Sequence, residues 1–221
     1  MTLCKLTNEN NKTYNNTQWG EGVTHTASEK GELCGSGWIH YYDSPLLAVL
    51  LNPIHADFIN PHLWSIKVDG EIKKGHDSKF GTTSLTTIER IPLPEINPTQ
   101  KIIFGILCAM EVYNDKDFQD WGERWIDGSD RSVKAAETAK TRAELEGRAV
   151  EAKVKWAARA AANSAFAAEL AARVVARTAK ATESNVARNI ARDVAWVAEL
   201  AAKTAEIDFH TIAEKAMTYG R

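Results

Sequence analysis

Cysteine and long apolar runs are scarce in this 221-residue sequence, and each shortage excludes a class of protein. The three cysteines, Cys4, Cys34 and Cys108, are an odd number at wide spacings. They argue against a disulfide framework and indicate a reducing compartment. No stretch reaches about 18 consecutive apolar residues, so no membrane-spanning helix is expected. The N-terminal stretch MTLCKLTNENNKTYNN lacks the apolar core of a secretory signal, so we expect a cytoplasmic protein.

A strong charge of either sign is also missing, because the formal net charge is only -2. No nucleic-acid or membrane partner is therefore expected. The charge is nevertheless uneven along the chain. Residues 1–129 hold 11 Lys and Arg against 17 Asp and Glu, whereas residues 130–221 hold 16 against 12. The opposite net charges of the two regions could help them dock, or could arise by chance.

Proline disappears after Pro98, and alanine takes over: 28 of the 91 residues after position 130 are alanine. Alanine has the highest intrinsic helix propensity, and proline breaks helices. We therefore predict an α+β domain over residues 1–129. An all-α, Ala-rich region over residues 130–221 should follow, as a helical bundle or a coiled coil.

Within the first region, residues 63–68 alternate and precede Asp69-Gly70, which predicts a β-hairpin. Residues 101–113 form a continuous apolar run, which we interpret as a buried strand, and residues 83–91 predict another strand that ends before Pro92. Ser44 and Pro45 are typical of a helix start, and Asn52-Pro53 should end that helix.

A second helix is expected before Gly128, because Phe118, Trp121 and Trp125 recur at helical spacing. In the Ala-rich region, residues 182–185 are the strongest helix break, with Gly147 and Asn163-Ser164 as weaker candidates. Four acid-before-base pairs, which include Glu199 and Lys203, support helix at i, i+4 spacing. A short final helix should begin after Asp208.

The long Ala-rich helix needs a partner, because small side chains bury little area alone. An unbroken helix over residues 131–181 would extend roughly 75 Å and outrun the helix that follows it. We therefore expect residues 130–221 to associate between chains as a homo-oligomer. The alternative is a bundle within one chain, broken at Asn163.

The segment from Gly31 to Phe58 is rich in reactive side chains, and three chemical interpretations of it compete with a structural one. Cys34, His40 and His55, with His25 or Cys108 as a fourth ligand, are the candidates for zinc, but no two of the first three have close-paired ligand spacing. Cys34 lacks a nucleophile signature, and GELCGSG lacks the Walker lysine. We therefore expect no catalytic residue, metal or cofactor, and interpret the segment as a strand and a helix.

The run from QWGEGVTHTA to RIPLPE resembles an uncharacterised domain family met mainly in phage and prophage proteins. The resemblance covers roughly residues 3–126. It depends on Cys34, Gly37, His40, Pro45 and the segment 63–72. Members often carry an Ala-rich helical tail, and the resemblance implies a phage setting without supplying an activity. The order of elements is also similar to that of ADP-ribosyltransferases, with Glu111 the nearest counterpart of their late-strand glutamate.

Three functions follow as hypotheses. The first is a non-enzymatic binding protein, multivalent through its tail, which sequesters a nucleotide-type immune signal or a host defence protein. The second is an enzyme that acts on a nucleotide or ADP-ribosyl substrate, and the third is a virion protein with a helical spacer. For the first two we predict a pocket lined by aromatic and cationic residues that suit a base or a phosphate. These residues are Trp19, His25, His40, Tyr41, Trp64 and Lys79.

Overall fold

The computed structural model describes residues 2–75, 79–147, 152–177 and 183–219. It divides into two compact units, Met1–Glu95 and Ile96–Arg221. The first unit contains a seven-stranded sheet and the second contains helices, which confirms an α+β region followed by a helical one. The boundary follows Glu95, so the predicted boundary at residue 129 lies inside the helical unit. Two helices, Pro98–Met110 and Lys116–Asp127, lie before residue 129 in the sequence but pack on the later helices.

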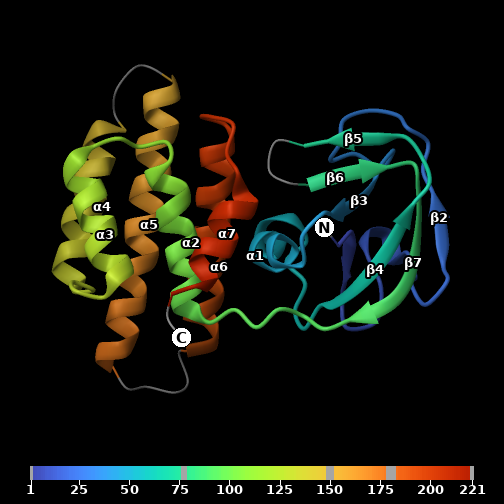
Figure 1. Ribbon diagram of the computed structural model, residues 1–221, viewed down its shortest axis with the longest axis horizontal. Coiled ribbons are helices and arrows are strands. Elements are labelled where there is room, and N and C mark those ends of the chain that lie inside the picture. Colours follow the sequence, from blue (N-terminus) through green and yellow to red (C-terminus); the bar gives the residue numbers. More distant parts are fainter. Residues whose placement is uncertain (1, 76–78, 148–151, 178–182, 220–221) are drawn as a thin grey trace. The chain divides into compact units, whose positions relative to one another are not determined.

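All strand pairs of the sheet unit are antiparallel, in the order β2-β7-β4-β1-β3-β6-β5 (Figure 1). The strands are β1 (Cys4–Thr7), β2 (Thr24–Thr26), β3 (Ile39–Tyr42), β4 (His62–Val68), β5 (Ile72–Lys74), β6 (Lys79–Thr82) and β7 (Ser84–Ile91). A 3-10 turn, η1 (Tyr14–Asn16), and one helix, α1 (Pro45–His55), complete the unit. The predicted strands at residues 39–42, 63–68 and 84–91 are confirmed.

The predicted hairpin turn at Asp69-Gly70 is wrong, although the strands on either side of it exist. β4 pairs with β1 and β7, so neither of its edges is open to β5. β5 pairs with β6 instead. Asp69-Gly70 therefore bends the chain between two strands, and the chain reverses only after Lys74.

Helix α1 begins as the sequence predicts and ends later. Ser44 Oγ accepts a hydrogen bond from the Leu47 N–H, and Pro45 occupies the first helical position. The helix continues to His55 with Pro53 inside it, so the predicted stop at Asn52-Pro53 is wrong. α1 contacts β1 and β3 and buries Leu47 and Leu51 (Figure 1).

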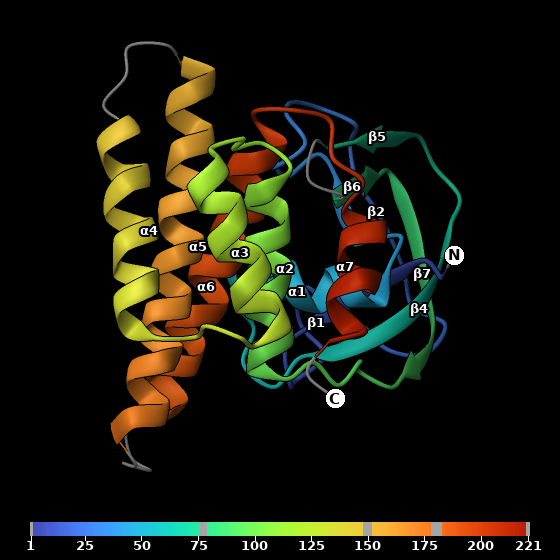
Figure 2. The ribbon, with the colours of Figure 1, turned by 60° about the vertical axis from the view of Figure 1, so that its left-hand side comes forward.

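The helical unit contains six helices in the described residues. They are α2 (Pro98–Met110), α3 (Lys116–Asp127), α4 (Val133–Glu146), α5 (Ala152–Arg177), α6 (Glu183–Ala202) and α7 (Phe209–Met217). α2 contacts α3, α5, α6 and α7, and α4, α5 and α6 follow one another side by side (Figures 1 and 2). No helix in the described ranges combines the length and apolar character that a membrane crossing requires.

The predicted strand at residues 101–113 is wrong, because this segment is the central helix α2. Its N-terminus carries a capping box: Asn97 Oδ1 accepts from the Gln100 N–H, and Gln100 Oε1 accepts from the Asn97 N–H. Four neighbouring helices cover it, so apolar residues occupy all its faces and the helical period is hidden. Glu111 follows the end of α2 and lies on no strand, unlike the glutamate that the ADP-ribosyltransferase similarity implies.

The Ala-rich helices turn back on one another within the chain. α4 ends at Glu146 with Gly147 as its C-cap, and α5 begins at Ala152. The weaker break candidate Gly147 is therefore confirmed, and residues 131–181 do not form one unbroken helix. α5 passes through Asn163 without a break, α6 begins at Glu183, and residues 178–182 of the expected break lie outside the described residues. Alanines form the buried face of α5, at positions 157, 158, 160, 161, 162, 165, 167 and 168. The alanine stripe thus finds its partner in the same chain, and self-association stays a prediction.

Candidate functional site

Three of the six predicted ligand residues lie in the core of the sheet unit. Trp19, Tyr41 and Trp64 are at most 5% exposed, and Trp19 and Tyr41 share one apolar cluster with Leu85. Trp19 Nε1 donates to Thr13 Oγ1, and Trp64 Nε1 donates to Thr7 Oγ1. Their burial favours the core interpretation over a pocket lining.

Lys5 is a buried cation of this unit that sequence reasoning missed. It is 6% exposed and faces Trp64 across β1 and β4. Its Nζ lies 4.7 Å from the Trp19 ring centre and donates to the His40 carbonyl at 2.8 Å. Burial lowers the pKa of Lys5 to about 7. The sequence contains a clue to this position, because Cys4 and Leu6 alternate with Lys5 and Thr7. In a strand this alternation places Lys5 and Thr7 on one face, and both faces of β1 are buried.

The other three predicted residues are distributed around the sheet. His25 packs its ring against Trp19, with ring centres 4.6 Å apart, and its Nε2 bonds to the Gln18 carbonyl. The His40 ring bonds to the Leu33 carbonyl, and burial lowers the pKa of His40.

Lys79 lies beside Cys34, because its Nζ donates to Cys34 Sγ at 3.3 Å. The three cysteines are free thiols, with Cys4 and Cys108 buried and Cys34 exposed. Across the described ranges, no three His, Cys, Asp or Glu side chains gather into a group that could hold a metal ion. His55 instead bonds through Nδ1 to the Tyr42 hydroxyl at 2.7 Å.

A stronger candidate site lies in the helical unit, between α3 and α4. Asp115 caps α3 by accepting from the Phe118 N–H, and Gly128 ends the helix in the left-handed conformation. The face predicted from Phe118, Trp121 and Trp125 is confirmed as the buried face of α3.

Ion pairs and hydrogen bonds connect α3 and α4 at both ends of the helix pair. At one end, Arg142 of α4 forms ion pairs with Asp115 and Asp117 of α3, and the Tyr113 hydroxyl donates to Glu146 at 2.7 Å. At the other end, Arg131 donates to the Trp125 and Ile126 carbonyls and lies over the Trp125 ring. Between these two sets of interactions, α4 faces α3 with the small side chains of residues 135, 138 and 139.

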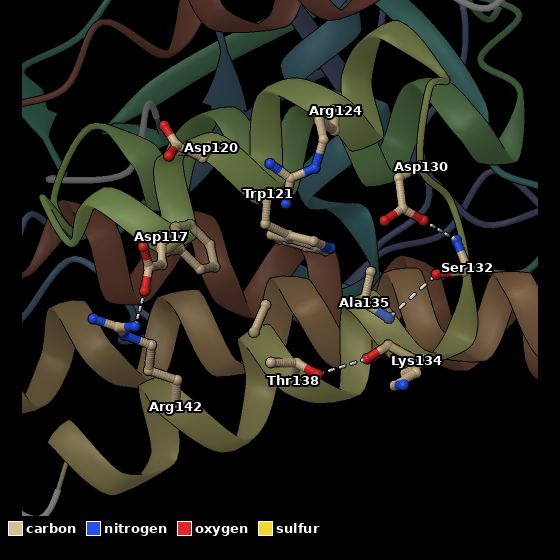
Figure 3. A pocket seen from close by; sticks show the side chains of 12 residues that line it. Asp117, Asp120, Trp121, Arg124, Asp130, Ser132, Lys134, Ala135, Thr138 and Arg142 are labelled. Carbon is tan, nitrogen blue, oxygen red and sulfur yellow. Dashed lines mark hydrogen bonds and ion pairs between the residues drawn. The ribbon is translucent and has the colours of Figure 1, made fainter.

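This arrangement leaves a pocket of about 440 Å³ between the two helices, which we call the α3–α4 pocket (Figure 3). Phe118 and Trp121 form its buried apolar wall, with ring centres 5.2 Å apart. Its lining comprises Asp117, Phe118, Asp120, Trp121, Arg124, Asp130, Ser132, Lys134, Ala135, Thr138, Ala139 and Arg142.

Three hydrogen-bond donors of this lining have no partner. Trp121 is 2% exposed, and its Nε1 is buried with no hydrogen-bond partner in the described chain. The guanidinium of Arg124 and the ammonium of Lys134 likewise form no ion pair or hydrogen bond among the described residues. Figure 3 shows Trp121 and Arg124 on α3 above the start of α4, and Lys134 on the first turn of α4 with its side chain directed away from Trp121.

The three carboxylates of the lining are engaged. Asp117 pairs with Arg142, Asp120 pairs with Lys116 at 2.6 Å, and Asp130 accepts from the Ser132 N–H at 3.0 Å. Hydrogen bonding from Ser132 lowers the pKa of Asp130. The hydroxyls of Ser132 and Thr138 bond to backbone groups of α4. The groups left open are therefore donors, which suits a ligand rich in acceptors.

Sequence reasoning identified Trp121 as a helix-face residue but missed Arg124 and Lys134. Both are common surface cations, and only the placement of α4 beside α3 brings them to one pocket. Comparisons with protein-family models, curated proteins and solved structures gave no match. The function is therefore argued from the geometry of this pocket.

Proposed function

We propose that this protein is a non-enzymatic binding protein that holds a small polar ligand in the α3–α4 pocket. The observation that carries the proposal is the buried indole N–H of Trp121, which has no partner in the described chain and shares one lining with the exposed cations Arg124 and Lys134. Leaving a buried donor unsatisfied costs roughly 1–3 kcal/mol, and a ligand acceptor would remove that cost. The pocket volume of about 440 Å³ lies within the range of small-molecule sites.

Binding is better supported than catalysis in this pocket. The Thr138 hydroxyl donates to the Lys134 carbonyl, and Ser132 Oγ accepts from the Ala135 N–H. The Ser132 side chain also hydrogen-bonds to Asp130 and lowers the pKa of that carboxyl, which makes Asp130 a weak general base. A nucleophile needs a free hydroxyl or thiol beside a base. The resemblance to phage proteins makes sequestration of a nucleotide-type signal the biological counterpart of this binding, and self-association would make it multivalent.

A ligand screen on the full chain tests the proposal. A library of small polar molecules is added, and thermal unfolding and backbone NMR shifts are recorded. Ala135→Trp fills the pocket from the α4 side and should abolish the stabilisation and the shifts of pocket residues. Thr141→Trp places the same bulk on α4 outside the lining and should retain both.

The proposal fails if no compound shifts the pocket resonances. It also fails if Ala135→Trp binds the hits as well as wild type does. In that case the unpartnered donors would be a feature of the fold alone.

A further inference from the structure

We infer that the α3–α4 pocket binds an anionic oxygen group, a phosphate or a carboxylate, held by Arg124, Lys134 and the indole N–H of Trp121. This inference rests on the proposed function and names the ligand class of the same site.

The Trp121 indole is the most specific observation. The side chain is 98% buried, since its exposure is 2%, and its nitrogen meets no acceptor in the described residues. An indole can only donate, so the missing group is an acceptor. In Figure 3 the nitrogen end of the ring faces the start of α4, within the pocket.

The two cations add a charge requirement. Arg124 lies one turn beyond Trp121 on α3, and Lys134 lies in the first turn of α4. A neutral acceptor would satisfy Trp121 and leave both cations unpaired. A charged oxygen group would accept from Trp121 and be attracted by both cations, and the planar guanidinium of Arg124 can bind two oxygens of such a group at once.

The start of α4 contributes in the same direction. α4 has 14 residues, and Ser132 Oγ accepts the Ala135 N–H, which satisfies only one of the first-turn donors. The partial positive charge of a helix N-terminus favours an anion beside it. The helix end alone would not define a site, but it coincides with Trp121, Arg124 and Lys134.

The carboxylates of the lining attract a cationic ligand less than their number suggests. Asp117 and Asp120 already have ion-pair partners, and Asp130 is stabilised by Ser132. A cationic ligand would have to compete for these partners while lying near Arg124 and Lys134. An anion meets Arg124 and Lys134, neither of which forms an ion pair within the described residues, although Arg124 contributes to the lowered pKa of Asp127 and of Asp130.

The experiment titrates the full chain with inorganic phosphate, acetate, ethylammonium and glycerol, followed by NMR of the indole N–H resonances. Phosphate or acetate should shift the Trp121 indole resonance and leave that of Trp125 in place. Arg124→Gln and Lys134→Gln should each weaken binding about tenfold, the loss expected for a charged hydrogen bond. Raising the salt concentration from about 0.05 to about 0.5 M should weaken binding further.

Trp121→Phe removes the indole N–H and keeps an aromatic ring, and it should weaken binding several-fold. Trp125→Phe is the matched control, because Trp125 Nε1 is also buried without a partner but does not line this pocket. If Trp121→Phe does not fold, the exposed changes at Arg124 and Lys134 still decide the question.

The separate titrations with phosphate and with acetate distinguish the possible sources of the anionic group. Binding of phosphate alone supports a phosphate ester, binding of acetate alone supports a carboxylic acid, and binding of both supports the shared chemistry. Equal binding of glycerol or ethylammonium, or unchanged affinity in Arg124→Gln, overturns the inference. If neither anion binds but the screen yields a ligand blocked by Ala135→Trp, the anion inference fails and the binding function stands.

Discussion

The Lys5 ammonium lies 4.7 Å from the centre of the Trp19 ring and donates a hydrogen bond to the His40 carbonyl. Burial disfavours the charged form of an amine, and it lowers the pKa of Lys5 from its ordinary value of 10.5 to about 7. A cation over the face of an indole gains back part of this loss. The sheet unit therefore contains a group that changes charge near neutral pH.

We expect Lys5→Met to change the pH dependence of stability. Between pH 7 and 10.5 the unfolded chain holds the proton on Lys5 and the folded chain does not. Wild-type stability should therefore rise across this window by up to about 1.4 kcal/mol per pH unit, with no contribution from Lys5 to the slope below or above it. Lys5→Met should lose this slope and be more stable than wild type at pH 7.

Urea unfolding of the full chain, followed by hydrogen exchange of sheet amides, measures this difference. Lys67→Met is the control, because the side chain of Lys67 is 68% exposed and pairs only with Asp69. Parallel pH curves for wild type and Lys5→Met would contradict the assignment of the slope to Lys5.

A second prediction concerns the ion pair between Lys140 of α4 and Glu169 of α5, at 2.8 Å. Glu169 is 5% exposed, so Glu169→Gln leaves the Lys140 cation facing a neutral group in a covered position. We expect a loss of about 2 kcal/mol in the free energy of unfolding of the helical unit. In the double-mutant cycle of Lys140→Met and Glu169→Gln, the double variant should lose less stability than the sum of the two single losses.

Additive losses in that cycle would mean that the two side chains do not interact. Phe166 also contacts this pair, since Lys140 Nζ lies 5.1 Å from its ring centre. A Phe166→Leu background separates the ion pair from this contact.

Local signals in the sequence predicted individual elements well and their partners poorly. Ser44 and Asp208 cap helices as expected, because a cap depends on neighbours within three residues. The Glu199–Lys203 pair is confirmed for the same reason, with 2.9 Å between the charged groups. The period of α2 was hidden because its packing partners, α6 and α7, come about a hundred residues later.

The candidate site shows the same limit. Phe118, Trp121 and Trp125 predicted the buried face of α3, but nothing local indicates that the Trp121 nitrogen lacks an acceptor. That property depends on α4, whose Ala135 and Thr138 are too small to fill the space opposite Trp121. Pairing between two helices is set by side-chain shapes across the interface, which a single sequence does not display.

A third prediction concerns self-association. Leu170 and Ile190 lie on the apolar stripe of the Ala-rich region, so a change to Asp at either position would probe a chain–chain interface. Ile190, however, is only 4% exposed within one chain. Ile190→Asp should therefore reduce helix content at every protein concentration, because a charge is buried without a partner. Leu145→Asp, at a side chain that is 56% exposed, should retain the helix content.

Circular dichroism and light scattering over a wide concentration range measure both effects. If the predicted homo-oligomer forms, wild type should show a mass above one chain. A loss of that mass in Leu145→Asp would place the interface on α4. Full helix content in Ile190→Asp would contradict the packing of α6 described above.

The last prediction concerns the bend that the sequence analysis took for a hairpin turn. β4 pairs antiparallel with β7, and β5, which comes next along the chain, pairs antiparallel with β6. Val68 lies opposite Leu85 in the first pair, and Ile72 lies opposite Thr82 in the second. Between these two pairs, Gly70 lies against the backbone of Thr83 and Ser84. A Cβ atom at Gly70 would lie 2.2 Å from Thr83 Oγ1 and 2.6 Å from the Ser84 nitrogen.

Gly70→Ala should therefore destabilise the sheet unit by about 2 kcal/mol, because a backbone atom that takes part in the bend must move. Gly20→Ala is the matched control, since its nearest contact would be 3.5 Å from Val23. Truncating the side chain by Thr83→Ala in the Gly70→Ala background relieves only one of the two clashes, so it should not restore stability. Urea unfolding measures all three variants, and wild-type stability in Gly70→Ala would show that the bend tolerates a side chain.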